Sequence, residues 1–127
     1  MNEDQEGGED DMATGHQALM TDEERELVSF GLIAVAGEAR SLAFQALAAA
    51  REHDFERAGD LLEQSKSAAL KAHHQQTDLL VREANGDHTP VDVMLVHAQD
   101  HLMTSMLAQE LIQELIYLHK EKADRAG

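Results

Sequence analysis

The chain has 127 residues, no cysteine, a single proline and a formal net charge of −15. Its length predicts one domain, and the lack of cysteine excludes disulfides and thiolate metal ligands. The charge argues against binding to nucleic-acid phosphates or to an anionic membrane surface. An acidic surface either attracts a basic protein partner or only keeps the protein in solution. With few aromatic residues, the core must come from Ala, Leu, Val, Ile and Met, which favour helices.

The first twenty residues carry only acidic charges and several glycines. Such a segment buries too little apolar surface to offset its ordering entropy, so we predict a disordered acidic tail over residues 1–20. No signal peptide and no apolar run of about 20 residues is evident, so we expect a soluble, cytoplasmic protein that does not insert into a membrane.

An ordered helical domain is predicted over residues 21–127, and its first two helices have clear end signals. Thr21 and Glu24 fit a capping box, which begins a helix that continues to about Arg51. Asp54 is placed to cap a second helix, which ends near Ala84 before the turn sequence Asn-Gly-Asp. Gly31 and Gly37 in the first helix would allow close helix approach.

The third helix is predicted to begin at Thr89-Pro90, with proline at its first position, and to run to about Lys122. Short connections between long helices predict an all-α fold, an antiparallel three-helix bundle. A repeat of four and three residues along the third helix marks its predicted buried seam: Val93, His97, Asp100, Thr104, Leu107 and Leu111.

A polar cluster interrupts this seam. His97, Asp100 and His101 lie at helical spacing on one face, and Thr104 extends that face. Polar groups in a buried seam are costly unless they are partnered. The cluster is therefore either a functional surface or a set of groups that satisfy one another.

Two chemistries suit these residues. A neutral imidazole at His97 is a nucleophile that can accept a phosphoryl group, with His101 or Thr104 donating hydrogen bonds to the phosphoryl oxygens. No Walker loop or kinase signature is present, so the phosphoryl donor must be a partner protein. Alternatively, His97, Asp100 and His101 form a metal site in a metal-binding helical bundle, although Ala98 after the first histidine excludes a zincin protease.

Three stretches of the sequence resemble the enzyme IIA component of the lactose/cellobiose/diacetylchitobiose phosphotransferase system. They are residues 31–41, residues 72–77 and the stretch around His-Ala-Gln-Asp-His at residues 96–104, and the resemblance covers about residues 24–122. The resemblance implies a three-helix subunit that assembles as a homotrimer, a nine-helix bundle. It implies that His97 is phosphorylated on Nε2 by the histidine phosphocarrier protein and passes the group to a cysteine of enzyme IIB. A purely structural trimeric bundle is the remaining alternative.

The same resemblance assigns roles to other residues. Asp100 would lie on the trimer axis and bind a divalent cation, Mg²⁺, with one ion per trimer. Three carboxylates that meet on an axis must share protons or bind a cation, which agrees with that role. His101, Thr104 and Gln99 are candidates to stabilise the phosphoryl group.

Further positions are left with open alternatives. His73 and His74 either approach the site or form an exposed pair, and Gln76 is expected to pair with buried polar groups. Arg40 is expected to bridge an acid rather than to offset phosphoryl charge. Residues 103–112 are more similar to the cellobiose and diacetylchitobiose branch than to the lactose branch, so a β-linked disaccharide of that kind is the expected sugar.

Overall fold

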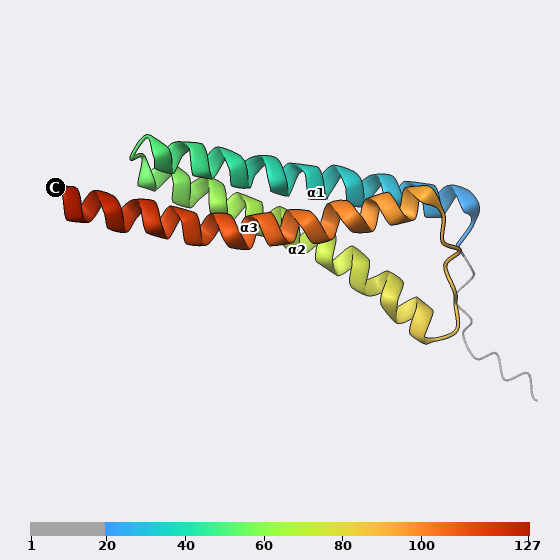
Figure 1. Cartoon of the computed structure of the whole chain (residues 1–127). Coiled ribbons are helices and arrows are strands. Elements are labelled where there is room, and N and C mark those ends of the chain that lie inside the picture. The colour runs from blue at the N-terminus through green and yellow to red at the C-terminus, as the bar shows by residue number, and fades with distance from the viewer. Residues whose placement is uncertain (1–19) are drawn as a thin grey trace, which may run out of the picture.

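The computed structural model describes residues 20–127. These residues form three helices and no strand: α1 (Asp22–Arg51), α2 (Phe55–Ala84) and α3 (Val93–Ala126). Consecutive helices run in opposite directions, so α3 returns alongside α1 (Figure 1). The predicted antiparallel three-helix bundle is therefore confirmed. The predicted disordered tail lies outside the described residues, apart from Met20 at its end.

The first two helices begin and end where their capping residues predict. The Thr21 hydroxyl accepts a hydrogen bond from the Glu24 backbone N–H (3.2 Å), and the Glu24 carboxylate accepts one from the Thr21 N–H (3.0 Å). Asp54 caps α2 by accepting from the Arg57 N–H at 3.1 Å. These bonds satisfy backbone donors that a helix start leaves without partners.

The start of α3 differs from the prediction. The helix begins at Val93 rather than at Pro90, because Asp92 is its N-cap and accepts from the Leu95 N–H at 2.8 Å. The backbone N–H of Thr89 instead donates to the Glu83 carboxylate at 3.1 Å, which ties this residue to the end of α2. The helix also continues past Lys122 to Ala126, because no glycine or proline ends it before Gly127.

The core is built mainly from alanines. Small side chains allow helix axes to approach closely, and α1 packs against both other helices. Apart from Leu32 and Leu62, the buried apolar residues of α1 and α2 are all alanine. They are Leu32, Ala36, Ala39, Ala43, Ala46, Ala49 and Ala50 in α1, and Ala58, Leu62, Ala68, Ala69 and Ala72 in α2.

The two glycines of α1 do not make the close approach that the sequence suggested. A Cβ atom added at Gly37 would meet nothing within 4 Å, and one at Gly31 would meet only Gln75 Oε1 at 3.9 Å. The expectation for these glycines was therefore wrong for the single chain, because the alanines already supply the small surface that lets the helices pack.

The buried face of α3 is not the predicted one. It contains Ala98, Leu102, Ser105, Gln109 and Ile112, whereas the predicted seam through His97, Asp100, Thr104, Leu107 and Leu111 is exposed. The buried face begins with Ala98, a small residue that packs in the same cluster as Leu32 and Ala36 of α1. The larger apolar residues of the predicted seam are left on the surface of the chain.

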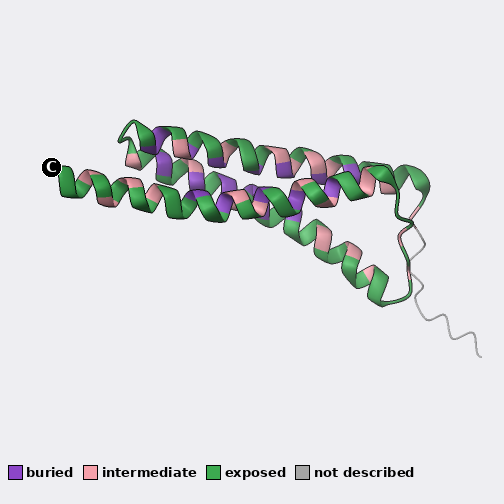
Figure 2. Cartoon of the chain, in the orientation of Figure 1, coloured by how far each residue is buried: buried purple, intermediate pink, exposed green. Residues whose placement is uncertain are grey.

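The helices are not equally close along their length. The C-terminal half of α2 turns away from α1 and α3 (Figure 1), and it is mostly exposed (Figure 2).

Helix α1 is long and apolar enough to cross a membrane by length and composition alone. Core helices of soluble proteins pass the same test, and the buried face of α1 forms the centre of this bundle.

Candidate functional site

The middle of α3 presents the polar cluster to solvent. His97 and Asp100 are exposed and His101 is half-buried. The His97 and His101 rings meet edge to face, with centroids 4.5 Å apart and an interplanar angle of 80°. The cluster is therefore accessible on the surface of the single chain, and it is not a buried set of groups that satisfy one another.

The hydroxyl of Thr104 faces its own helix. It donates to the backbone oxygen of Asp100 at 2.7 Å, and it also lies 3.4 Å from the backbone oxygen of His101. Threonine commonly bonds back to the preceding turn of a helix in this way. In this arrangement its proton is not directed toward the His97 ring.

Gln99 lies on a different side of α3 from His97. Its Oε1 accepts a hydrogen bond from Gln76 Nε2 at 2.6 Å, and the same nitrogen lies 3.7 Å from Met103 Sδ. Gln76 thus pairs with a polar group, as expected, although the Gln99 amide is half-buried rather than buried. The structure uses Gln99 to join α3 to α2 and does not bring it to His97.

The other sequence candidates lie apart from the cluster. His73 and His74 on α2 are exposed, and the backbone oxygen of His73 accepts from the Thr77 hydroxyl at 3.0 Å. The Arg40 guanidinium lies 5.7 Å from the centre of the Phe44 ring, a cation–π contact. Within residues 20–127 Arg40 forms no ion pair, so the expected bridge to an acid is not found there, and its neighbour is the aromatic face one turn along the helix.

The metal-binding alternative fails for the single chain. Within residues 20–127, no group of three His, Cys, Asp or Glu side chains converges on a point that could hold a metal ion. His97, Asp100 and His101 project from one helix, and a site from one helix is too cramped to surround an ion.

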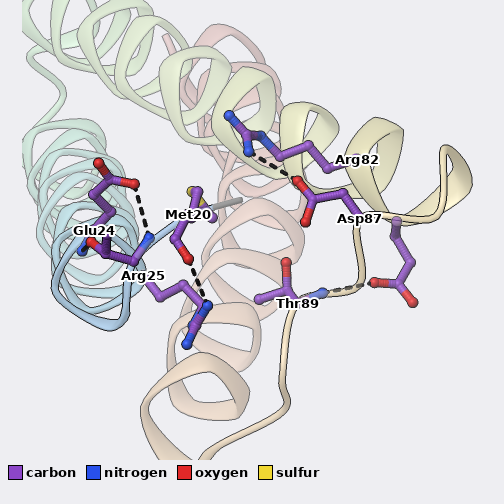
Figure 3. Close-up of polar contacts among 8 residues, drawn as sticks. Met20, Glu24, Arg25, Arg82, Asp87 and Thr89 are labelled. Atoms are coloured by element: carbon purple, nitrogen blue, oxygen red, sulfur yellow. Dashed lines mark hydrogen bonds and ion pairs between the residues drawn. The ribbon is translucent and has the colours of Figure 1, made fainter. Parts of the chain in front are cut away.

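Polar contacts fix the loop that leads into α3 (Figure 3). Arg82 forms an ion pair with Asp87 at 3.1 Å, and the Glu83 carboxylate accepts a hydrogen bond from the Thr89 backbone N–H at 3.1 Å. The same carboxylate bonds to His88 Nδ1 at 2.8 Å. The bond from His88, and then that from Thr89, holds the pKa of the Glu83 carboxyl below its ordinary value. At the start of α1, the Arg25 guanidinium donates to the Met20 backbone oxygen at 2.8 Å.

These loop contacts were missed in the sequence. Their only signal was a run of charged and polar residues on both sides of the Asn-Gly-Asp turn, which does not tell which side chains meet. They tie the segment between α2 and α3 to the end of α2.

A stripe of exposed apolar side chains follows the surface of α3. We call it the α3 stripe, and Asp100 lies in its middle while His97 lies beside it. Its apolar members are Val93, Val96, Met103, Leu107 and Leu111. Exposed apolar stripes of this length mark protein–protein contact surfaces. The sequence showed this repeat, but it was assigned to the core of the chain.

Fold and site together define a three-helix bundle that presents an exposed histidine beside an unpartnered apolar helix face. Residues 27–120 match the family described as "PTS system, Lactose/Cellobiose specific IIA subunit". The chain is 52% identical over 99 residues to the N,N'-diacetylchitobiose-specific EIIA component of Escherichia coli strain K12, which covers 78% of this chain and 85% of the relative. The chain therefore belongs to the lactose/cellobiose IIA family of the phosphotransferase system, whose members are phosphotransferase components that carry phosphoryl groups.

Solved structures agree with this assignment. The cellobiose-specific enzyme IIA from Bacillus anthracis has a TM-score of 0.77 and 40% identity to this chain, and the match covers 88% of this chain and 100% of that structure's chain. The IIA(Chitobiose) subunit in its complex with HPr, from Escherichia coli, has a TM-score of 0.68 and 49% identity. This match covers 77% of this chain and 95% of the IIA(Chitobiose) chain.

Proposed function

We propose that His97 accepts a phosphoryl group from the histidine phosphocarrier protein HPr and passes it to a cysteine of enzyme IIB. The exposed imidazole of His97 on the surface of α3 is the observation that carries this proposal. A similar subunit has been solved in a complex with HPr, which supports HPr as the donor.

The proposed transfer needs little covalent machinery from this chain. The lone pair of His97 Nε2 attacks phosphorus while the P–N bond to the donor histidine breaks, and the new P–N bond is later broken by the attacking IIB thiolate. Such transfers depend on in-line placement and on stabilisation of charge. Both partners must reach the nitrogen, which the exposed position of His97 allows.

We further propose that three chains assemble through the α3 stripe. Three copies would then bring three Asp100 carboxylates together, and these would repel one another unless they share protons or bind a cation. Carboxylate oxygens are the ligands that Mg²⁺ prefers, so this residue fits a shared divalent site with one ion per trimer.

The sugar is proposed to be a β-linked disaccharide such as cellobiose or diacetylchitobiose rather than lactose, and the carrier is proposed to act in the cytoplasm. The relative with 52% identity is named for diacetylchitobiose and a similar solved subunit for cellobiose, which supports this choice.

The assignment of His97 is tested by His97→Gln, with His119→Gln as the matched control on the same helix. After incubation with phosphoenolpyruvate, enzyme I and HPr, intact mass should show one acid-labile phosphoryl group on the unaltered chain and on the control. His97→Gln should show none while its circular dichroism stays helical.

Phosphorylation of His97→Gln at the rate of the unaltered chain would refute the assignment. Unchanged sugar uptake with His97→Gln in place of the natural subunit would favour the purely structural trimer instead.

A further inference from the structure

The His97 ring contacts the ring of His101, one turn further along α3. We propose that His101 is a positioning residue for phosphoryl transfer, because its ring edge holds the His97 imidazole so that Nε2 faces the partner. This inference rests on the proposed phosphorylation of His97 and adds to it a residue that never touches the phosphoryl group.

The His97 side chain has few restraints of its own. Its side chain is exposed, and it makes no hydrogen bond to any group within residues 20–127. The edge-to-face contact with His101, at a centroid distance of 4.5 Å, is the ring contact that the structure gives it.

The helix explains why His101 is suited to this task. Side chains of an α-helix lean toward its N-terminus and cover the preceding turn, so a residue at position 101 lies over position 97. His101 is half-buried, and its helical neighbours Ala98 and Leu102 belong to the core. Its ring is therefore a fixed support, whereas His97 extends into solvent.

The other two candidates do not supply this support. The Thr104 hydroxyl donates to the backbone of its own helix, and Gln99 is bonded to Gln76 on α2. Of the residues that the sequence placed near the phosphoryl group, His101 is the one whose side chain meets the His97 ring.

The size of the effect follows from the strength of such contacts. An edge-to-face contact restricts rotation of the His97 ring. Its strength corresponds to roughly a two- to tenfold change in the fraction of chains whose His97 is oriented for attack. Transfer rates depend on in-line placement of the attacking atom. The loss should therefore fall on the rate at saturating donor rather than on the donor concentration needed for saturation.

The experiment compares His101→Ala with His101→Phe, using phosphorylated HPr as donor and rapid-quench kinetics. Phenylalanine keeps a ring edge without imidazole nitrogens, and alanine removes the ring while favouring the helix. Alanine should lower kcat by roughly two- to tenfold with KM little changed, and phenylalanine should restore kcat to within about twofold of the unaltered chain. Gln113→Ala, an exposed change on the same helix, should leave both constants unchanged.

Several outcomes would overturn the inference. A kcat for His101→Ala equal to that of the unaltered chain would show that the ring contact has no role. Failure of phenylalanine to restore the rate would assign the effect to the imidazole nitrogens instead. If the unaltered chain is not phosphorylated on His97, the proposed function fails as well, which separates the two cases.

Discussion

Two buried serines show how differently the same side chain is used in this core. Ser65 Oγ donates to the backbone oxygen of Ala39 at 2.6 Å and so joins α2 to α1. Ser105 Oγ is equally buried, but it has no hydrogen-bond partner among the residues that the structure describes. A buried hydroxyl without a partner costs free energy, whereas a satisfied one stabilises modestly.

We therefore predict opposite effects for two identical substitutions. Ser65→Ala should lower the free energy of unfolding by about 1 kcal/mol, because it removes the bond between helices. Ser105→Ala should leave that free energy unchanged or raise it by about 1 kcal/mol, because it removes an unpaired group. Urea denaturation at one fixed protein concentration measures both, and a larger loss for Ser105→Ala would contradict the assignment of the two hydroxyls.

At this scale the sequence predicted which residues share a face but not what each side chain contacts. Helical spacing alone places His97 beside His101, and the structure agrees. Spacing does not reveal rotamers, so it could not show that Thr104 bonds to its own backbone or that Arg40 lies over Phe44. The hydrogen bond of Gln99 was missed for a related reason, because its partner Gln76 comes from another helix.

Among the elements, the turn between α2 and α3 depends on one glycine. Gly86 has a φ of 88°, a conformation that side chains with a Cβ disfavour. A Cβ there would meet nothing within 4 Å, so any penalty comes from the backbone alone. Gly59, inside α2, has equally open surroundings but an ordinary helical backbone.

Replacing each glycine by alanine should thus shift stability in opposite directions. Gly86→Ala should destabilise the chain by about 1–2 kcal/mol through left-handed strain. Gly59→Ala should stabilise it by roughly 0.5–1 kcal/mol, because alanine is the better helix former. Thermal melts followed by circular dichroism compare the two, and a shift of both melting temperatures in the same direction would refute the backbone explanation.

Capping residues made the elements themselves predictable, with one instructive failure. Thr89 and Asp92 are both capping residue types, and only the structure shows that the Thr89 N–H is already bonded to Glu83. The buried face of α3 failed for another reason. Two repeats of similar period run along that helix, each with about as many apolar as polar residues, so the spacing alone did not separate the exposed one from the one through Ala98.

For the whole molecule, the α3 stripe is a surface without a partner in the single chain. Its leucines are more than half exposed, with Leu107 at 56% and Leu111 at 55%. Leaving such side chains exposed to water costs roughly 25 cal/mol of free energy for each Å² of apolar surface. A bundle of several chains that buries this stripe would also enclose Asp100. Its carboxylate would then need a counterion, because a buried unpaired charge is costly.

Two substitutions in the α3 stripe separate assembly from ion binding. Asp100→Leu should keep the trimer and phosphate acceptance but abolish Mg²⁺ binding, because it removes the carboxylates and extends the apolar face. Leu107→Asp should dissociate the trimer, because it would bring three new charges together in the contact. Gln113→Asp, away from the stripe, controls for the added charge.

Sedimentation velocity reports the assembly, and isothermal titration with Mg²⁺ should give one ion per three chains. A Leu107→Asp protein that stays trimeric would move the contact to another face. Loss of all phosphorylation in a folded Asp100→Leu trimer would mean that Asp100 serves the chemistry of His97 rather than the assembly. Unchanged Mg²⁺ binding in Asp100→Leu would place the ion elsewhere, because the apolar residues of the stripe offer no oxygen ligand in its place.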